Sequence, residues 1–371
     1  MRKKGPLPRL SGFSFKAAGV TTDVVTGAGA FRTLSDRLPR IAPGRWFVVS
    51  SDPVFGRHGA ALLWGARGAD IDPRPLLLPD GEAAKTWKAV GWLLDMLVAR
   101  GLRRDGGVVA LGGGTVGDAA GLAAALALRG VALVQAPTTL LAASDSAVGG
   151  KTGVDLPAGK NLAGTFHPAR LVVVEPAVFQ SLPDRDYRSG LAEIVKTALL
   201  SKSFHAAMGR LAPKLEARDR DAIAEAAGRS LRVKARFVAA DPFERLGKRF
   251  ALNLGHTVGH AIEAASGLKL RHGEAVAWGL FAALALSVDR AGLDPAVAAQ
   301  AAAWIRDLVR PPRPSASVLS HWPALLGADK KADRHGLRAV VLEAPGVPQV
   351  VRASAEELAL AFGAARARYN P

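Results

Sequence analysis

The hydrophobic pattern changes character about halfway along the chain. In the first half, short apolar runs at 46–50, 107–111, 131–135 and 171–174 alternate with helical segments such as 82–100. These runs have the length and the β-branched content of buried strands. Strands that alternate with helices in this way predict a parallel or mixed sheet with helices on both faces.

Beyond residue 180 the strand signals become scarce. Helical periodicity dominates there, in the segments 184–200, 218–240, 253–265, 274–290, 295–309 and 355–368. A single late strand is expected at 339–342. The pattern therefore predicts an α/β fold in which an N-terminal α/β domain over residues 1–180 precedes a mainly α-helical domain over residues 181–371.

Composition narrows the chemistry that this fold can carry. The chain has 371 residues, of which 49% are hydrophobic and 22% are charged, and it has no cysteine. Such a chain is long enough to bury a core without disulfides or a structural metal. The missing cysteine excludes disulfides, zinc–thiolate sites, iron–sulfur clusters and cysteine nucleophiles, so any metal ion must be held by His, Asp or Glu.

The chain is strongly basic. Its formal net charge is +17, from 49 Lys and Arg against 32 Asp and Glu. Such a surplus is typical of proteins that bind nucleic acid, anionic membranes or small acidic ligands. Aromatic residues make up only 6% of the chain and the cations are spread along it, which favours general surface charge over a nucleic-acid interface.

No segment predicts a membrane span or an export signal. Residues 1–9 are basic but no apolar stretch follows them. The longest apolar segments, 119–128 and 275–288, fall short of the roughly 20 residues that a bilayer requires. The expected location is the cytoplasm, without a membrane partner.

A glycine-rich turn joins the run at 107–111 to the next helix. Gly112, Gly114 and Gly117 satisfy the spacing G-x-G-x-x-G, in which glycines permit positive φ and let backbone N–H groups approach a pyrophosphate. The acidic ribose partner expected about 20 residues later is missing. A nucleotide site and a tight strand-to-helix turn explain this motif equally well, and a nucleotide domain here would differ from the ordinary Rossmann pattern.

Two lysines lie in loops that contain glycine. Lys151 follows Gly149-Gly150, and Lys160 stands between Gly159 and Asn161. Exposed backbone donors and a mobile cation suit an anionic ligand. The spacing is not that of a P-loop, and for each lysine taken alone a solvated turn is the better explanation.

A group of His and Glu residues provides the candidate metal site. His256 and His260 are spaced i, i+4, so they share one face of a helix, and His272 follows in the next segment. Glu193 lies on another expected helix, one turn before Lys196. The set suits a divalent metal with open positions for substrate oxygens. The glutamate that peptidases place between the two histidines is missing, and histidines with ordinary helix partners remain the alternative.

Together these motifs are similar to those of the 3-dehydroquinate synthases, a family of sugar-phosphate cyclases. The resemblance spans roughly residues 45–345 and rests on the order and spacing of Gly112-Gly113-Gly114-x-x-Gly117-Asp118, Leu128-Arg129-Gly130, Pro137-Thr138-Thr139-Leu140-Leu141, Asp145-Ser146, Gly149-Gly150-Lys151-Thr152-Gly153, Gly159-Lys160-Asn161, Gly190-Leu191-Ala192-Glu193, Asn253-Leu254-Gly255-His256-Thr257, Gly259-His260 and His272-Gly273-Glu274. Each motif alone is weak, whereas the combination is highly specific.

The resemblance implies an enzyme that uses NAD and a divalent metal, Zn²⁺ or Co²⁺. Such an enzyme cyclises 3-deoxy-D-arabino-heptulosonate 7-phosphate to 3-dehydroquinate with loss of phosphate. It is a carbon–oxygen lyase of the shikimate pathway and of aromatic amino acid biosynthesis. The hydride that NAD accepts is returned later, so no net redox change occurs. The resemblance also implies that the domain over residues 1–180 binds NAD, that the domain over residues 181–371 binds the metal and the substrate, and that the enzyme is a homodimer.

The site residues are carried over position by position. The positions that match metal ligands are Glu193, His256 and His272. Those that match nucleotide contacts are Asp52, Glu82, Lys85, Gly113, Gly114, Asp118, Thr138, Thr139, Lys160, Phe179, Ser181 and Asp186. Those that match catalytic groups around the substrate are Asp145, Lys151, Asn161, Lys196, Arg249, Asn253, His260 and Lys330, with Lys234 as a further candidate. Arg129 matches an arginine that reaches the substrate phosphate from the partner subunit, and His260 is the expected proton shuttle.

Several departures from the family pattern leave the substrate open. Val154-Asp155-Leu156-Pro157 replaces the commoner Val-Asn-His-Pro, and the chain between Lys234 and Arg249 is one residue longer. Ser181 and Asp186 stand where Thr and Glu are more usual. A related cyclase, such as an aminodehydroquinate or valiolone-type synthase, is therefore an alternative.

Two further alternatives explain less of the sequence. A metal-dependent polyol dehydrogenase would share the glycine turn and the histidine pair, but a neutral polyol needs no cluster of phosphate-binding cations. A nucleic-acid-binding protein would show steeply salt-dependent affinity for DNA.

Overall fold

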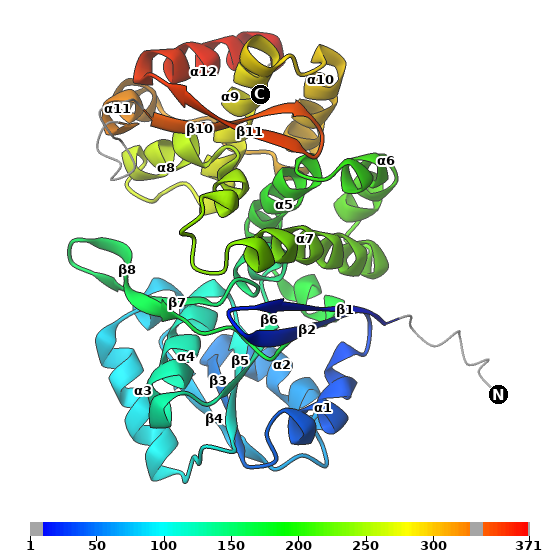
Figure 1. Cartoon of the computed structure of the whole chain (residues 1–371), viewed down its shortest axis with the longest axis vertical. Coiled ribbons are helices and arrows are strands. Elements are labelled where there is room, and N and C mark those ends of the chain that lie inside the picture. The colour runs from blue at the N-terminus through cyan, green and yellow to red at the C-terminus, as the bar shows by residue number, and fades with distance from the viewer. Residues whose placement is uncertain (1–9, 327–336, 370–371) are drawn as a thin grey trace, which may run out of the picture. The chain divides into compact units, whose positions relative to one another are not determined.

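The computed structural model describes residues 10–326 and 337–369. The basic segment 1–9 and Lys330 lie outside these ranges. The chain forms two compact units (Figure 1). The first comprises Met1–Leu182 and Arg220–Phe243, and the second comprises Pro183–Asp219 and Glu244–Pro371. The helix expected at 218–240 therefore belongs to the first unit, although its place in the sequence had put it in the second domain.

A seven-stranded sheet forms the centre of the first unit. Its strand order is β1-β2-β9-β6-β5-β3-β4. The bounds are β1 Ser11–Ala17, β2 Val20–Thr26, β3 Trp46–Ser51, β4 Ile71–Leu78, β5 Gly107–Gly112, β6 Ala132–Pro137 and β9 Leu171–Val174. β1 pairs with β2 in antiparallel fashion, and all other neighbours are parallel. Every residue of β3, β5 and β9 is buried, which explains why their sequences are continuous apolar runs.

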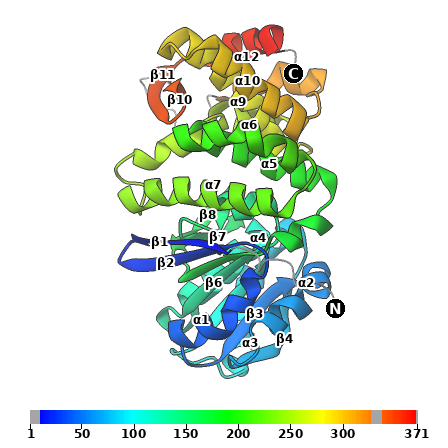
Figure 2. The same cartoon turned by 90° about the vertical axis from the view of Figure 1, so that its right-hand side faces the viewer.

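Helices complete this unit. They are α1 Leu34–Ile41, α2 Asp52–Gly65, α3 Trp87–Ala99, α4 Gly114–Leu126 and α7 Arg220–Ala240, with short turns η1 Ala30–Thr33, η2 Gly81–Ala84, η3 Ala127–Arg129, η4 Ala142–Ser146 and η5 Pro176–Ser181. α7 packs against β1 and β2 (Figure 2). The approach is close at Gly228, where a side chain would lie 3.1 Å from the hydroxyl oxygen of Thr26.

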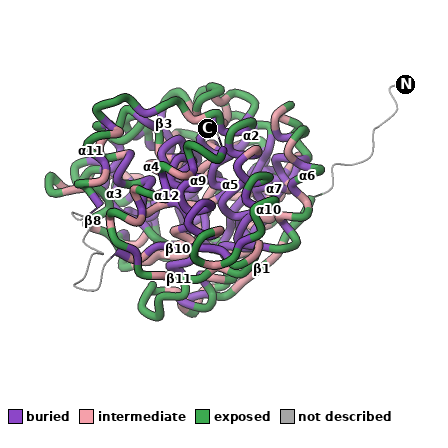
Figure 3. The backbone as a smooth tube through the Cα atoms, turned by 90° about the horizontal axis from the view of Figure 1, so that it is seen from above, coloured by how far each residue is buried: buried purple, intermediate pink, exposed green. Residues whose placement is uncertain are grey.

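The second unit is mainly helical. Its elements are α5 Asp184–Leu199, α6 Lys202–Glu216, η6 Lys248–Asn253, α8 His256–Ala265, α9 His272–Ala291, α10 Pro295–Trp304, η7 Ile305–Val309, α11 Ala316–Leu326, β10 Leu337–Ala344, β11 Val347–Ala353 and α12 Ala355–Tyr369. α9 is buried from Gly273 to Ser287 and contacts α5, α8, α12 and β10 (Figure 3). This burial explains its apolar character on all sides.

Three hairpins differ from the expected pattern, and the first of them is β1–β2, in a segment where no strand was expected. β7 (Lys151–Leu156) pairs with β8 (Gly159–Phe166), and β10 pairs with β11 where only one strand was expected. β8 and β11 are largely solvent-exposed, so they carry no apolar run that would reveal a strand. Among the described residues, no helix is both long enough and apolar enough to span a bilayer.

Candidate functional site

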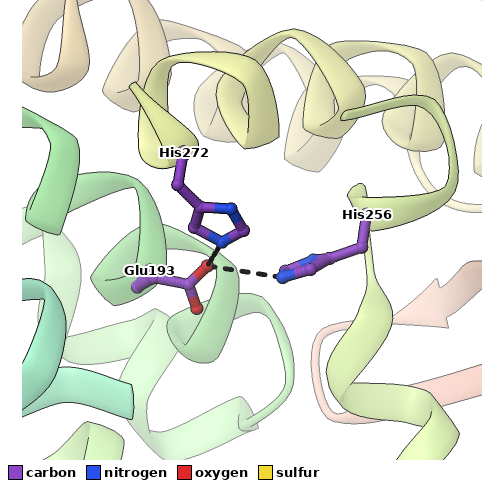
Figure 4. Close-up of side chains that lie close together, drawn as sticks. All are labelled: Glu193, His256 and His272. Atoms are coloured by element: carbon purple, nitrogen blue, oxygen red, sulfur yellow. Dashed lines mark ion pairs between the residues drawn. The ribbon is translucent and has the colours of Figure 1, made fainter. Parts of the chain in front are cut away.

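Three side chains that can hold a metal ion meet in the second unit (Figure 4). Glu193 comes from α5, whereas His256 and His272 are the first residues of α8 and α9. Oε1 of Glu193 lies 3.6 Å from Nε2 of His256 and 3.7 Å from Nε2 of His272. One potential ligand atom from each residue lies within 4.8 Å of the other two. The structure therefore brings together the three residues that the sequence assigned to the metal.

Close packing between helices places the two histidines. A side chain at Gly279 would lie 1.8 Å from the carbonyl oxygen of Gly255, the residue before His256. A side chain at Gly273 would lie 1.9 Å from the carbonyl oxygen of Ser189 in α5. Only glycine permits such contacts. Glycines thus allow α9 to approach both elements that carry the other ligands.

The carboxylate of Glu193 is buried among positive charges. Its side chain is 1% exposed and forms an ion pair through Oε2 with the ammonium group of Lys196. Apart from Lys196, no residue in the described ranges donates a hydrogen bond to either oxygen. Burial alone would raise the pKa of Glu193. The charges of Lys196, His256 and His272 outweigh burial and hold that pKa well below its ordinary value.

This set of donors fits a divalent cation. Bonds from zinc to nitrogen or oxygen are about 2.0–2.2 Å long, so neighbouring ligand atoms in a tetrahedral site lie about 3.4 Å apart. The observed separations of 3.6 and 3.7 Å are close to this value and too long for hydrogen bonds. A cation would supply the partner that the buried carboxylate oxygen Oε1 lacks.

The second ring nitrogen of each histidine is also held. Nδ1 of His256 lies 3.1 Å from the carbonyl oxygen of Leu254, and Nδ1 of His272 lies 3.1 Å from Oε2 of Glu263. Such partners fix a ligand imidazole with Nε2 available to the metal. Sequence reasoning missed Glu263, although it lies three residues after His260 on the same helix.

The pKa values of the two histidines are shifted in opposite directions. Burial would lower the pKa of His272, but its interactions with the carboxylates of Glu193 and Glu263 raise that pKa to about 10. Burial and the nearby Lys196 hold the pKa of His256 well below its ordinary value. The metal-free cluster therefore carries its proton on His272.

The other expected residues of this unit lie near the ligands in space or in sequence. The ring of His260 is exposed, with its centroid 5.2 Å from that of His256 and 5.8 Å from that of His272. Buried Arg249 forms an ion pair with Glu244 at 3.1 Å. Asn253 ends η6, three residues before His256. Asp186, expected at the nucleotide, pairs at 2.8 Å with Arg271, the residue before His272.

In the first unit, the expected nucleotide residues gather at one edge of the sheet. β6, β5, β3 and β4 are neighbours and run parallel, so their carboxyl ends meet at the same edge. The residues that follow these ends are Asp52 after β3, Glu82 and Lys85 after β4, Gly113, Gly114 and Asp118 after β5, and Thr138 and Thr139 after β6. This edge is where open α/β sheets bind their ligands.

The glycine turn serves close packing and not positive φ. None of its glycines is among the described residues with positive φ, contrary to the expectation from the sequence. A side chain at Gly112 would lie 2.5 Å from Cβ of Val116, and one at Gly117 would lie 2.8 Å from Oε1 of Gln135. The turn is therefore crowded by its own helix and by β6, and α4 begins directly at Gly114.

Lys85 contacts both Asp118, which is expected at the nucleotide, and Asn161, which is expected at the substrate. Nζ of the buried Lys85 lies 2.9 Å from Oδ2 of Asp118 and donates a hydrogen bond to Oδ1 of Asn161. Burial raises the pKa of Asp118, and the charge of Lys85 opposes this rise. Nearby, Lys160 pairs with Glu82 at 3.2 Å. The β7–β8 hairpin thus brings Lys160 and Asn161 to the residues that follow β4.

A second ion pair connects α7 to η4. Nζ of Lys234 lies 2.8 Å from Oδ1 of Asp145 and donates to its backbone carbonyl at 2.9 Å. Because the chain after Lys234 is one residue longer than in the family, this lysine was an uncertain candidate. In the structure it contacts Asp145, which is itself an expected site residue. Lys151 is exposed at the start of β7.

Arg129 follows an unusual backbone path. Leu128, Arg129 and Gly130 all have positive φ, at 51°, 68° and 114°. Left-handed conformations are uncommon for residues other than glycine. The exposed Arg129 side chain is therefore presented by a strained turn.

Two further residues expected at the nucleotide, Phe179 and Ser181, belong to the first unit. Phe179 is fully buried in the core, and the hydroxyl group of Ser181 lies 3.0 Å from Nε2 of His58. Lys330, the late substrate candidate, lies outside the described residues.

Comparison with known proteins identifies relatives along most of the chain. Residues 75–189 match the model of the 3-dehydroquinate synthase N-terminal domain, and residues 190–332 match that of the C-terminal domain. A 3-dehydroquinate synthase of Caulobacter vibrioides is 44% identical over 324 residues, covering 84% of this chain and 86% of that protein. One from Laribacter hongkongensis is 40% identical over 305 residues, covering 82% and 84%.

Solved structures share the fold. A 2-deoxy-scyllo-inosose synthase in complex with carbaglucose-6-phosphate, NAD⁺ and Co²⁺ superposes with a TM-score of 0.83 at 24% identity, over 95% of this chain and 99% of that one. A 2-epi-5-epi-valiolone synthase from Streptomyces hygroscopicus with NAD⁺ and Zn²⁺ gives a TM-score of 0.81 at 26% identity, over 96% and 99%. With the family models and the curated relatives, these findings establish that the chain belongs to the 3-dehydroquinate synthase family.

Proposed function

We propose that this chain cyclises 3-deoxy-D-arabino-heptulosonate 7-phosphate to 3-dehydroquinate and releases phosphate, as a carbon–oxygen lyase of the shikimate pathway. The observation that carries the proposal is the cluster of Glu193, His256 and His272 beside the buried Lys196. It supports the family assignment because a set of one carboxylate and two imidazoles leaves coordination positions for substrate oxygens.

The two units take different parts of the chemistry. In the second unit, Glu193, His256 and His272 would hold a divalent metal, Zn²⁺ or Co²⁺, which would supply Lewis acidity toward the alcohol that is oxidised. In the first unit, the residues at the carboxyl edge of the sheet would hold NAD, which would supply reversible hydride chemistry. The nucleotide residues that follow β3, β4, β5 and β6 support this assignment.

The remaining residues bind the substrate and move protons. Lys151, Arg249 and Asn253 bind the anionic and hydroxyl groups of the sugar acid, since cations and amides supply the donors that such groups require. Lys196 keeps the Glu193 carboxylate ionised through its charge. His260, exposed beside the metal ligands, carries the proton between substrate and water.

The enzyme acts as a homodimer in which Arg129 reaches the phosphate bound by the partner subunit. The exposed side chain and the strained turn at residues 128–130 support this role. Strain of this kind persists only where the surrounding structure maintains it, and it is common at functional sites.

A phosphate-release assay tests the proposal. Purified protein with NAD and Zn²⁺ or Co²⁺ should form one dehydroquinate for each phosphate released from the heptulosonate phosphate. The amino analogue of this substrate is the matched comparison. Release from the amino analogue alone would assign the chain to the aminodehydroquinate synthases, and release from neither would refute the proposed reaction.

A further inference from the structure

The pairing of β7 with β8 is interrupted at Asp155. Val154 pairs with Ala163 and Leu156 pairs with Gly159, so the single residue Asp155 faces the three residues 160–162. Irregularities of this kind turn side chains out of the regular alternation of a strand. Here the interruption coincides with Asn161, the residue expected at the substrate.

Asp155 forms hydrogen bonds with both Lys85 and Asn161, the two residues whose side chains meet. Its backbone N–H donates to the carbonyl oxygen of Lys85 at 2.9 Å. Its carboxylate oxygen Oδ1 accepts the backbone N–H of Asn161 at 2.8 Å and lies 4.0 Å from Nζ of Lys85. The side chain is only 20% exposed. One residue thus connects the hairpin tip to the segment that carries Lys85.

The bond to Asn161 fixes an uncommon backbone conformation. Asn161 has a φ of 56°, in the left-handed region that asparagine tolerates better than most residues. A carboxylate that accepts the N–H of such a residue makes a charge-assisted bond, which is stronger than a neutral one. Asp155 therefore stabilises the conformation in which the Asn161 side chain meets Lys85.

The contact with Lys85 also settles how the Asn161 amide is oriented. An ammonium group is a donor only, so it takes the amide oxygen of Asn161 as its acceptor. The NH₂ group of Asn161 then faces away from Lys85 as a donor of the kind that a hydroxyl or carboxylate oxygen of a sugar acid accepts. Lys85 itself is 6% exposed and forms an ion pair with Asp118 at 2.9 Å.

We propose that Asp155 is a positioning residue for the substrate side of the site. It holds Asn161 in the left-handed conformation and thereby presents the Asn161 amide to the sugar-phosphate substrate. The proposal rests on the proposed function for the identity of the substrate. The positioning itself concerns only the hairpin and can be measured without turnover.

The experiment compares Asp155→Ala with Asp155→Asn. Asparagine keeps an acceptor oxygen at the same place but removes the charge, whereas alanine removes both. Asp70→Ala is the matched control, because Asp70 is a 61% exposed carboxylate of the same unit that pairs only weakly with Arg45, at 3.4 Å. Amide hydrogen exchange of the peptide covering residues 157–163 is measured together with kcat and KM for the heptulosonate phosphate.

We expect Asp155→Ala to speed exchange at Asn161 and to raise KM, each by about tenfold, which is the cost of losing one hydrogen bond to a charged group. The value of kcat should change less than about threefold, and exchange outside the hairpin should stay as in the wild type. Asp155→Asn should restore both exchange and KM to within about threefold, and Asp70→Ala should change neither.

Three results would overturn the proposal: unchanged exchange in Asp155→Ala, faster exchange with an unchanged KM, or an Asp155→Asn variant as defective as the alanine variant. If the wild-type enzyme does not turn over the heptulosonate phosphate, the proposed function fails. The exchange comparison between the alanine and asparagine variants then still decides whether Asp155 holds Asn161.

Discussion

At the scale of single residues, the metal site depends on a few buried charges. Glu193 supplies the negative charge, Lys196 and the histidines surround it, and Glu263 orients His272 from behind. Each of these groups is costly to bury alone, so the cluster is stable only as a set. A substitution of one member should therefore also change the charge state and the stability of the others.

Glu193→Gln keeps the size of the side chain and removes its charge. We expect a loss of metal affinity larger than the 10–100-fold that an outer partner typically contributes, with a matching loss of turnover. Metal content after dialysis and calorimetric titration with Zn²⁺ measure this effect. The exposed Glu356→Gln is the control in the same unit. Full retention of metal by the Glu193 variant would show that the ligands lie elsewhere.

Metal binding should release protons. Because the pKa of His272 is raised to about 10, its Nε2 carries a proton at pH 7.5 in the metal-free protein. A metal ion must displace that proton, so binding should release about one proton, and apparent affinity should rise up to tenfold per pH unit between pH 7 and 9. Titrations in two buffers with different ionisation enthalpies count the protons. A count of zero would contradict the protonated state of His272.

At the scale of elements, the glycines of α9 allow its neighbours to approach. Gly279→Ala would place a methyl group against the carbonyl oxygen of Gly255, where only backbone movement can make room. Overpacking of this kind typically costs about 1–3 kcal/mol. We expect a lower Tm and weaker metal binding, since His256 follows Gly255 directly.

Gly363→Ala is the control for this change. Gly363 lies in α12, and a side chain there would meet no atom within 4 Å. The substitution should be neutral or should stabilise the protein by about 0.4–1 kcal/mol, because alanine restricts the unfolded chain. Equal Tm values and equal metal affinities for the two variants would show that α9 does not need glycine at position 279.

Helices and strands that bury one face or all of their residues could be predicted from the sequence, because burial imposes an apolar pattern. Exposed strands carry no such pattern and could not be predicted. β3, β5 and α9 are recognisable in the sequence because their burial on all sides demands long, nearly continuous apolar segments. β8 and β11 are half-solvated hairpin strands, and their pairing depends on partners that local pattern does not specify. The three candidate metal ligands follow from the resemblance to the family, whereas the contact of Glu263 with His272 depends on the packing of α8 against α9.

At the scale of the whole molecule, the net charge of +17 exceeds what the site residues explain. A basic protein attracts anionic sugar phosphates over several ångströms, and salt screens this attraction, with a Debye length of about 10 Å at 0.1 M and about 3 Å at 1 M. We expect kcat/KM to fall about three- to tenfold between low and high salt, through KM, while kcat stays nearly constant. A kcat/KM that is independent of salt would assign the surplus charge no role in substrate capture.

The path of the chain has a consequence for dissecting this enzyme genetically. The polypeptide passes between the two units at residues 182/183, 219/220 and 243/244, because α7 returns to the first unit. A fragment cut near residue 190, where the two family models meet, would lose the helix that packs on β1 and β2. Neither half would then be a complete folding unit. Separate expression of the first unit requires that residues 220–243 be kept together with the residues up to 182.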